Sequence, residues 1–375
     1  MMIIGEHRPT KLVIDRAAIR HNIQEEVQRL PENCELFMVV KANGYGHGAV
    51  QVAEAAKAAG ATGFCVAILD EALELRAAGF DEPILVLGVV EPKYAPLMAR
   101  EKVSATVAAE DWLDEAGHYL ALSQPREPLR VHLGLDTGMG RIGFQTPTAL
   151  KQVIAYLDDH TAAFTFEGMF THFSTADEAS TDYFDKQVAR WDAFMAVVPN
   201  KPRYVHVTNS ATSLWHADHN VNIVRYGAAG YGLNPSGKAL QPPFELKPAM
   251  RLVSELAHCK QLNAGESVSY GATYTSTQDE WVGTVSLGYA DGYERRLQGF
   301  HVLVDGQACE IIGRICMDQL MIRLPRQYPR GTKVVLLGRS GNQEITLQDL
   351  AEYCGTINYE IACGFTARLP RRYVH

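Results

Sequence analysis

The sequence lacks the features by which membrane-spanning, secreted and nucleic-acid-binding proteins are usually recognised. No apolar run approaches the roughly 20 residues that a membrane helix needs. The apolar opening, residues 1–4, is too short for the core of a signal peptide, because charged residues follow it at once. Blocks of basic residues are also missing, and the formal net charge is −8. We therefore expect neither a membrane nor a nucleic acid as a partner.

Cysteine pairs and metal-ligand clusters are missing as well. The seven cysteines are scattered and form no C-x-x-C pair. This spacing favours a reducing, cytoplasmic location with cysteines as small buried side chains, rather than a disulfide framework or a zinc site. The group His216-Ala217-Asp218-His219 has no further ligands near it in the sequence, so a solvated loop is the better interpretation and no metal is expected.

The sequence does contain a series of apolar runs that alternate with amphipathic segments. Counting from residues 37–40, eight runs have the pattern of strands buried on both faces, and helical patterns such as 70–78 and 181–198 lie between most of them. Eight such units predict an α/β fold, a (β/α)₈ barrel of the TIM type. The other seven runs are 63–69, 83–88, 103–107, 129–135, 164–173, 204–209 and 222–227.

Beyond a segment rich in proline and glycine, residues 232–243, the strands lose their helices. Asp305-Gly306 is a hairpin signal between two of these strands, and one short helix is expected over 346–353. We predict a barrel domain over residues 10–240 and a mostly-β domain over 241–375, with the surplus strand 11–15 pairing with the second domain. The predicted strands are 250–262, 280–288, 300–304, 309–315, 319–324 and 332–338.

One stretch joins a buried strand to a lysine and a glycine-rich loop. Residues 37–40 run directly into Lys41, and three glycines follow between residues 44 and 48, with Tyr45 and His47 among them. Barrel enzymes place their chemistry at the carboxyl ends of strands, and glycines let the backbone approach a ligand. A lone lysine at a strand end would more simply extend into water, so the loop is what favours a functional role.

This stretch resembles the cofactor-binding lysine segment of the alanine racemases. The resemblance continues in one order through nearly the whole chain. It implies a fold-type III barrel with a β-domain, pyridoxal 5'-phosphate as cofactor, a homodimer, and interconversion of L- and D-alanine, which supplies D-alanine for peptidoglycan. The further segments that carry it are 136–143, 168–173, 206–211, 224–227, 268–274, 287–292, 312–321 and 356–360.

The resemblance assigns the two bases that racemisation needs on opposite faces of one carbon. Lys41 would bind the cofactor covalently and serve one face, and Tyr270 would reach the active site of the partner subunit and serve the other. An ordinary tyrosine has a pKa of about 10, and His172 is its expected helper. From the residues alone, Tyr270 could be a plain loop tyrosine and His172 a hydrogen-bonded core histidine.

Further residues are assigned to the cofactor and the substrate. The resemblance puts Arg225 against the pyridine nitrogen, with His206 either supporting it or only packing. Arg141 would reach the cofactor's phenolic oxygen and the substrate carboxylate, and Met317 would contact the substrate through its backbone. Tyr289, Arg295, Arg314 and Asp318 would shape the access route. The other cofactor-binding residues, most of them around the phosphate, are Tyr45, His172, Asn209, Ser210, Gly227, Ala228 and Tyr359.

Gly134 departs from the family pattern. Many members carry at this position a lysine whose carbamylated, negatively charged side chain orients the arginine, and glycine cannot take that role. We expect Arg141 to be partly buried, and an unpaired buried guanidinium is costly. A chloride or other small anion near Gly134 and Arg141 is therefore the predicted substitute, with ordered water or another carboxylate as alternatives.

Three other functions remain open. A racemase of the same fold could act on serine or another amino acid. A non-catalytic pyridoxal-phosphate-binding barrel protein is disfavoured by Tyr270 and by residues 241–375, since such proteins have no β-domain. A decarboxylase of this fold is disfavoured because the cysteine motif of those enzymes has no match.

Overall fold

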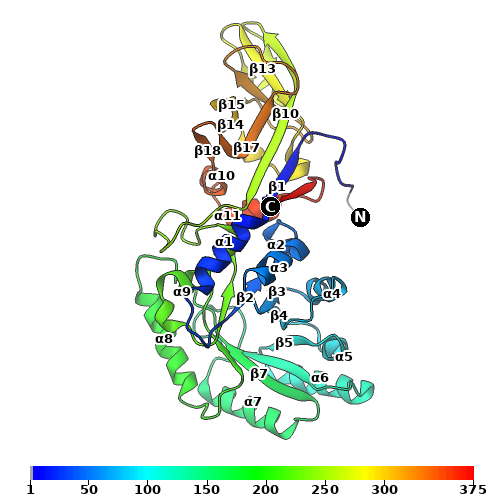
Figure 1. The fold of residues 1–375 in the computed structure, drawn as a ribbon, viewed down its shortest axis with the longest axis vertical. Helices are drawn as coiled ribbons and strands as arrows, with labels where there is room; N and C mark the ends of the chain where they lie inside the picture. Colours follow the sequence, from blue (N-terminus) through cyan, green and yellow to red (C-terminus); the bar gives the residue numbers. More distant parts are fainter. Residues whose placement is uncertain (1–2) are drawn as a thin grey trace. The chain divides into compact units, whose positions relative to one another are not determined.

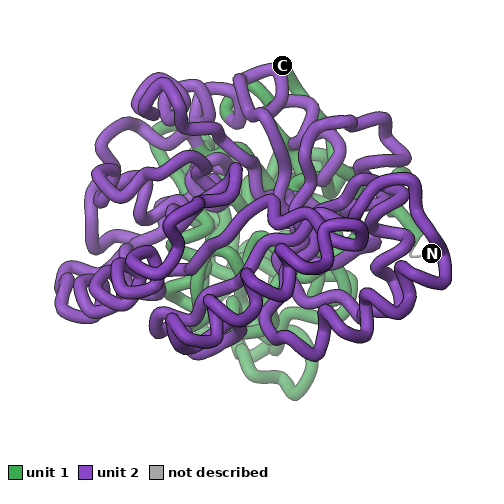
Figure 2. Tube along the Cα trace, turned by 90° about the horizontal axis from the view of Figure 1, so that it is seen from below, with its two compact units in different colours: residues 1–18, 45–48, 248–375 green, residues 19–44, 49–247 purple. Residues whose placement is uncertain are grey.

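The computed structural model describes residues 3–375, and the chain divides into two compact units (Figures 1 and 2). Unit 1 contains residues 1–18, 45–48 and 248–375, and unit 2 contains residues 19–44 and 49–247. None of the helices within residues 3–375 is both long enough and apolar enough to cross a membrane.

Unit 2 is built around eight parallel strands, which confirms the predicted barrel. Their order is β8-β7-β6-β5-β4-β3-β2-β9, and a parallel bridge between Thr208 and Val224 links the segment after β8 back to β9. Most of the strand residues are fully buried, as expected where helices cover one side and side chains fill the other. The strands are β2 Glu35–Val39, β3 Gly63–Val66, β4 Ile84–Val86, β5 Val103–Val107, β6 Leu129–Gly134, β7 Phe164–Phe170, β8 Tyr204–His206 and β9 Ile223–Tyr226.

Helices separate these strands along the chain. Four of them, α4, α6, α7 and α9, begin after a residue with extended backbone; Thr146 and Asn209 also cap their helices by accepting a backbone N–H through the side chain. The helices are α1 Arg16–Val27, α3 Ala49–Ala58, α4 Leu69–Ala77, α5 Ala95–Arg100, α6 Glu110–Ser123, α7 Pro147–Asp159, α8 Asp182–Met195 and α9 Ser210–Trp215. The segment labelled α2, Lys41–Tyr45, is a turn with left-handed backbone at Ala42, Asn43 and Gly44.

Unit 1 is a mostly antiparallel β-structure, as predicted. Its sheet has the order β18-β17-β14-β15-β16-β13-β10-β1-β19, and a further pairing of β17 with β10 closes six of these strands into a ring. Asp305 and Gly306 form the predicted hairpin between β14 and β15, both with positive φ. The strands are β1 Lys11–Asp15, β10 Met250–Leu262, β13 Glu280–Val285, β14 His301–Val304, β15 Gln307–Ile312, β16 Leu320–Leu324, β17 Lys333–Ser340, β18 Gln343–Ile345 and β19 Arg371–Val374, with a separate pair β11 Ser267–Val268 and β12 Tyr274–Thr275.

Helix α11, Asn358–Gly364, and strand β19 of unit 1 were not predicted from the sequence, which indicated a single helix in this part of the chain. Helix α10, Leu347–Cys354, corresponds to the expected one, and a second helix, α11, follows at Asn358–Gly364. Strand β19 was not predicted either, because Arg371 and Arg372 give it no apolar pattern. It adds to the sheet in parallel with β1, so that β1 lies between β10 and β19.

Candidate active site

Lys41 follows β2 by two residues and begins an unusual turn. The next four residues have φ values of 52°, 53°, 60° and 50°, and only one of them, Gly44, is a glycine. Each non-glycine residue in this left-handed conformation costs about 1–2 kcal/mol, so the surroundings must hold the turn. The Glu71 carboxylate accepts from the Ala42 N–H at 2.6 Å, and the Asn43 side chain accepts from the Ala49 N–H at 3.0 Å. Strain retained at a strand end is typical of a functional site.

His172 lies just beyond the carboxyl end of β7, where the charges of three cationic side chains act on it. Removal from water and the charges of Arg225, Arg141 and Lys41 lower its pKa to about 3, so the imidazole is neutral. Asn209 holds it: the Asn209 Oδ1 accepts from the Thr212 N–H, and Nδ2 donates to His172 Nε2 at 3.3 Å. The structure thus brings three predicted site residues, Lys41, Arg141 and Arg225, within electrostatic range of a fourth.

Arg225 is buried on β9 and fixed through both of its terminal nitrogens. Nη2 donates to the carbonyl of Thr171 at 2.8 Å, and Nη1 lies 2.5 Å from His206 Nδ1. Burial lowers the pKa of Arg225 to about 10, so the guanidinium remains charged at neutral pH. None of its hydrogen bonds with residues 3–375 uses Nε. Arg225 therefore retains one N–H for a ligand.

Residues after β8 and β9 form a small backbone cradle at the same edge of the barrel. Ser210 begins α9, and its hydroxyl accepts from the Gly227 N–H at 2.8 Å. Ala228 begins the next turn and is buried. Because parallel strands end at one edge of the sheet, this cradle shares that edge with Lys41, His172 and the loop of Arg141.

The burial predicted for Arg141 is wrong. Its side chain is exposed, and it has no hydrogen bond or ion pair with any residue in the range 3–375. The Asp136 carboxylate accepts from the N–H groups of Gly138 and Gly140, both at 3.0 Å, so it is engaged within its own loop. Gly134 is buried, and a Cβ there would make ordinary contacts with Phe170 and Val107 at 3.6 and 3.7 Å.

The remaining predicted residues belong to unit 1. Tyr270 is 70% exposed and lies on a turn whose neighbours Ser269 and Ala272 have positive φ. Tyr45 and Tyr359 lie together, with ring centroids 6.0 Å apart. Met317 is 52% exposed.

Sequence profiles of one family match both parts of the chain: the alanine racemase N-terminal domain over residues 14–235 and the alanine racemase C-terminal domain over residues 249–373. The chain belongs to the alanine racemase family. Alanine racemase of Levilactobacillus brevis is 70% identical over 374 residues, which cover 100% of each chain. Full-length likeness at this level makes the protein a racemase, an isomerase enzyme.

Solved structures of the alanine racemase family agree. The chain is similar to the crystal structure of alanine racemase from E. faecalis, with a TM-score of 0.96, 57% identity and 100% of each chain covered. It is also similar to histidine racemase from Leuconostoc mesenteroides, with a TM-score of 0.93, 35% identity and coverage of 99% of this chain and 100% of the other. The fold of the family is therefore compatible with more than one amino-acid substrate.

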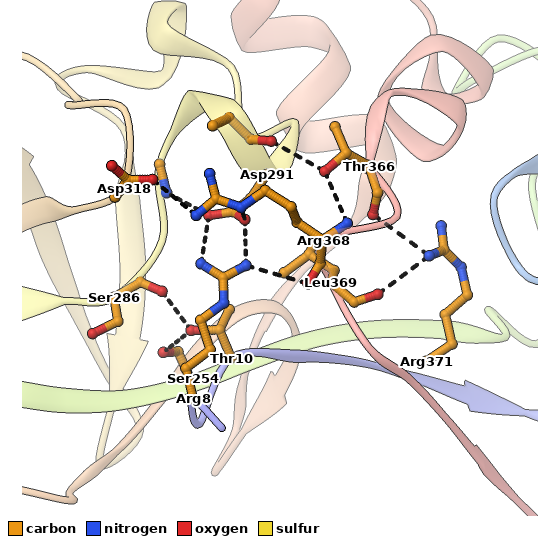
Figure 3. Close-up of polar contacts among 12 residues, drawn as sticks. Arg8, Thr10, Ser254, Ser286, Asp291, Asp318, Thr366, Arg368, Leu369 and Arg371 are labelled. Atoms are coloured by element: carbon orange, nitrogen blue, oxygen red, sulfur yellow. Dashed lines mark hydrogen bonds and ion pairs between the residues drawn. The ribbon is translucent and has the colours of Figure 1, made fainter. Parts of the chain in front are cut away.

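In this member of the alanine racemase family, a buried ionic cluster in unit 1 fixes the turn that carries Tyr289. Asp291 is fully buried and pairs with Arg8 and Arg368, and Arg368 also pairs with Asp318 at 2.8 Å (Figure 3). The backbone N–H groups of Tyr289 and Ala290 donate to the carbonyls of Cys316 and Met317. The cluster thus connects two of the loops that the family resemblance assigns to substrate access.

A second group of buried polar residues, in the barrel of unit 2, was missed by the sequence analysis. Ser104, His132 and Glu167 lie on β5, β6 and β7 and are at most 8% exposed. The available signal was a charged residue inside the apolar run 164–173, since a buried carboxylate needs partners. His206, for which support of Arg225 and simple packing were both open, contacts Arg225 directly.

Proposed function

We propose that this protein interconverts L-alanine and D-alanine with pyridoxal 5'-phosphate bound to Lys41. The observation that carries the proposal is the set of groups at the carboxyl edge of the barrel: Lys41, the neutral His172, and the guanidinium of Arg225 with Nε available. A guanidinium donates and never accepts, so it suits a ring nitrogen with a lone pair. The Ser210–Gly227 cradle, with Ala228, suits a phosphate.

The residues then divide the reaction between them. The cofactor, when bound, supplies an electron sink that acidifies the substrate's α-proton. Lys41 moves that proton on one face of the carbon, and Tyr270 moves it on the other. Arg225 donates a hydrogen bond to the ring nitrogen but does not transfer its proton to it. The ring nitrogen therefore stays unprotonated, which makes the cofactor a weaker electron sink and disfavours side reactions. Asn209 orients His172, while Arg141 and the Met317 backbone hold the substrate.

We further propose the surroundings in which this chemistry occurs. The protein acts as a homodimer in which Tyr270 serves the active site of the partner subunit. Residues 10–240 form the cofactor-binding domain, and residues 241–375 form the domain that carries Tyr270. The enzyme works in the cytoplasm, where it supplies D-alanine for peptidoglycan synthesis.

The likeness to a histidine racemase makes substrate identity the first point to test. Purified protein is incubated separately with each L-amino acid, and formation of the D-enantiomer is measured by chiral chromatography. We expect alanine to give the highest kcat/KM. A higher value for histidine or serine would replace alanine as the substrate while leaving the racemase chemistry in place.

Covalent labelling should identify the cofactor lysine. Borohydride reduction of the holoenzyme, followed by peptide mapping, is expected to place a pyridoxyl group on Lys41, because Lys41 follows a buried strand at the catalytic edge of the barrel. The Lys41→Ala variant serves as the control and should take up no label. A pyridoxyl group on another lysine of the native protein would contradict the assignment.

If an anion replaces the lysine that many family members carry at position 134, the substrate KM should depend on which anion is present. We propose that a chloride or other small anion near Gly134 orients Arg141, because Asp136 is already occupied by backbone N–H groups. Replacing chloride with a bulky anion at constant ionic strength should raise the substrate KM several-fold, as expected for losing an interaction of about 1 kcal/mol.

Gly134→Lys tests the same anion site from the protein side, since carbamylation of the new lysine would supply the charge. The variant should lose most of the chloride dependence. Equal KM values for the native protein in both anions would contradict the proposal.

A further inference from the structure

Five polar side chains on consecutive strands of the barrel are linked by hydrogen bonds. Arg225 Nη1 lies 2.5 Å from His206 Nδ1, His206 Nε2 lies 3.0 Å from His132 Nδ1, and His132 Nε2 lies 3.2 Å from Glu167 Oε2. The Ser104 hydroxyl donates to the same carboxylate oxygen. Because the bond from β6 to β8 passes over β7, the chain of bonds crosses the packed interior rather than following neighbouring strands.

The direction of every bond in this chain follows from Arg225, which can donate but cannot accept. His206 Nδ1 must therefore be unprotonated. Burial and the charge of Arg225 keep the pKa of His206 well below its ordinary value, so the ring is neutral and its single proton is on Nε2. That proton is donated to His132 Nδ1, which leaves the His132 proton on Nε2, facing Glu167. All three N–H groups thus donate in the same sense along the series of bonds, from Arg225 toward Glu167.

A charged carboxylate completes this arrangement. Burial raises the pKa of Glu167, but the hydrogen-bonding and electrostatic interactions with His132, the hydrogen bond from Ser104 and the charge of Arg130 outweigh burial and lower it overall. Glu167 therefore accepts and does not donate. Arg130 itself is a distant partner, 3.9 Å from Oε1, whereas both hydrogen bonds are made to Oε2.

The backbone of β7 has an irregularity that makes room for this series of hydrogen bonds. The register between β6 and β7 passes from Val131 opposite Phe166 to His132 opposite Gly168, so Glu167 is an extra residue in a β-bulge. Bulges re-aim side chains, often beside active sites. A Cβ on Gly168 would lie 2.5 Å from the His132 ring, so only glycine leaves that ring its place.

We propose that Glu167 and His132 are positioning residues that act through His206 to hold the guanidinium of Arg225 in one orientation. The carboxylate fixes the tautomer of His132, His132 fixes that of His206, and the unprotonated Nδ1 of His206 keeps Nη1 of Arg225 directed at itself. The Nε–H bond of Arg225 then points in one fixed direction, where it can donate to a ligand. The proposed consequence for catalysis rests on the proposed contact between Arg225 and the cofactor ring, but the proton positions do not.

The direct test is to locate the protons in the native protein without cofactor or turnover. NMR of nitrogen-labelled histidines, assigned with His132→Asn and His206→Asn, distinguishes protonated from unprotonated ring nitrogens. We expect unprotonated Nδ1 and protonated Nε2 in both rings. A protonated Nδ1 or a doubly protonated ring at either position overturns the proposal, and this reading needs no variant of Glu167 to fold.

Variants then test whether this series of hydrogen bonds controls the orientation of the Arg225 guanidinium. Glu167→Ala removes the acceptor, and Gly168→Ala displaces the His132 ring while retaining every titratable group. Both should give a mixture of His206 tautomers, shift the absorbance spectrum of the bound cofactor, and lower kcat by roughly 10- to 100-fold with little change in KM, by analogy with outer-shell partners of metal-bound histidines. Arg130→Gln, which removes the longer ion pair with Glu167 and a pair with Glu127 but neither hydrogen bond to Glu167, is the matched control and should change neither tautomers nor spectrum.

The outcomes separate this proposal from the proposed function. Native tautomers as expected, together with no racemase activity on any amino acid, would refute the function and leave the chain of bonds intact. Normal activity and an unchanged spectrum in folded Glu167→Ala would refute the positioning role while the racemase function stands.

Discussion

Racemisation by the Tyr270→Phe variant is expected to fall by about 10²–10⁴-fold, the usual loss when a positioned acid–base group is removed. Phenylalanine keeps the ring but cannot transfer a proton, and in the proposed mechanism Lys41 serves only one face of the carbon. Exchange of the α-proton with solvent should therefore fall strongly from one enantiomer and little from the other. The measurement is proton exchange from L- and D-alanine, followed separately by NMR in heavy water.

Two controls sharpen the Tyr270 experiment. Tyr94→Phe changes another exposed tyrosine, remote in sequence from every assigned residue, and should leave both exchange rates unchanged. If Tyr270 serves the partner subunit, inactive Lys41→Ala and Tyr270→Phe chains should regain activity when they form mixed dimers. Equal and mild losses with both enantiomers would contradict the two-base proposal.

Removal of the Asp291 side chain should destabilise the protein by about 3–5 kcal/mol, since breaking a buried ion pair leaves unpaired charge behind. Asp291 is fully buried between Arg8 and Arg368 (Figure 3), and its carboxylate also accepts from the Gly288 N–H at 3.1 Å. The Asp291→Ala variant should unfold at a clearly lower urea concentration, measured at fixed protein concentration because the dimerisation that we propose would add to stability.

Asp318→Ala is the matched control for Asp291. Asp318 pairs with the same Arg368, but its side chain is 57% exposed. Exposed pairs contribute about 0–1 kcal/mol, so this variant should unfold close to the native midpoint. A similar loss of stability in both variants would show that burial is not what makes the Asp291 cluster important.

The barrel strands could be predicted from the sequence because each is a short apolar run buried on both faces. The predicted limits were too wide where burial continues past the strand. The run 63–69 ends as a strand at Val66, and Leu69 already begins α4. In the same way β7 ends at Phe170, and the buried residues after it belong to the loop that carries His172. Apolar pattern reports burial, and burial is not limited to strands.

Features set by contacts distant in sequence could not be predicted. Strand β19 forms because β1 offers it a paired edge, which no local pattern of Arg371–Val374 reveals. The left-handed turn after Lys41 contains Ala42 and Asn43, which have no special preference strong enough to indicate it, and depends on Glu71 far along the chain. The bulge at Glu167 likewise depends on the register with β6.

The candidate site divides in a similar way. Lys41, Arg225 and His172 could be located because they sit in or directly after apolar strands of a recognisable family pattern. The exposure of Arg141 could not, because side-chain burial in a loop depends on how neighbouring loops fold over it. The partners of His206 could not be predicted either, since a bond between β6 and β8 depends on which side chains of these two strands meet beside β7.

The placement of β1 has a consequence for how the protein is made. Leu12 and Ile14 on β1 are fully buried between β10 and β19, yet β10 begins only at Met250. At about 5–20 residues per second, a ribosome needs roughly 10–50 s to add the residues between β1 and β10. Throughout that time the nascent chain carries an apolar strand with two unpaired edges, which is a template for aggregation. Unit 2 can fold while synthesis continues, but the sheet of unit 1 is completed only after its last strand has been translated.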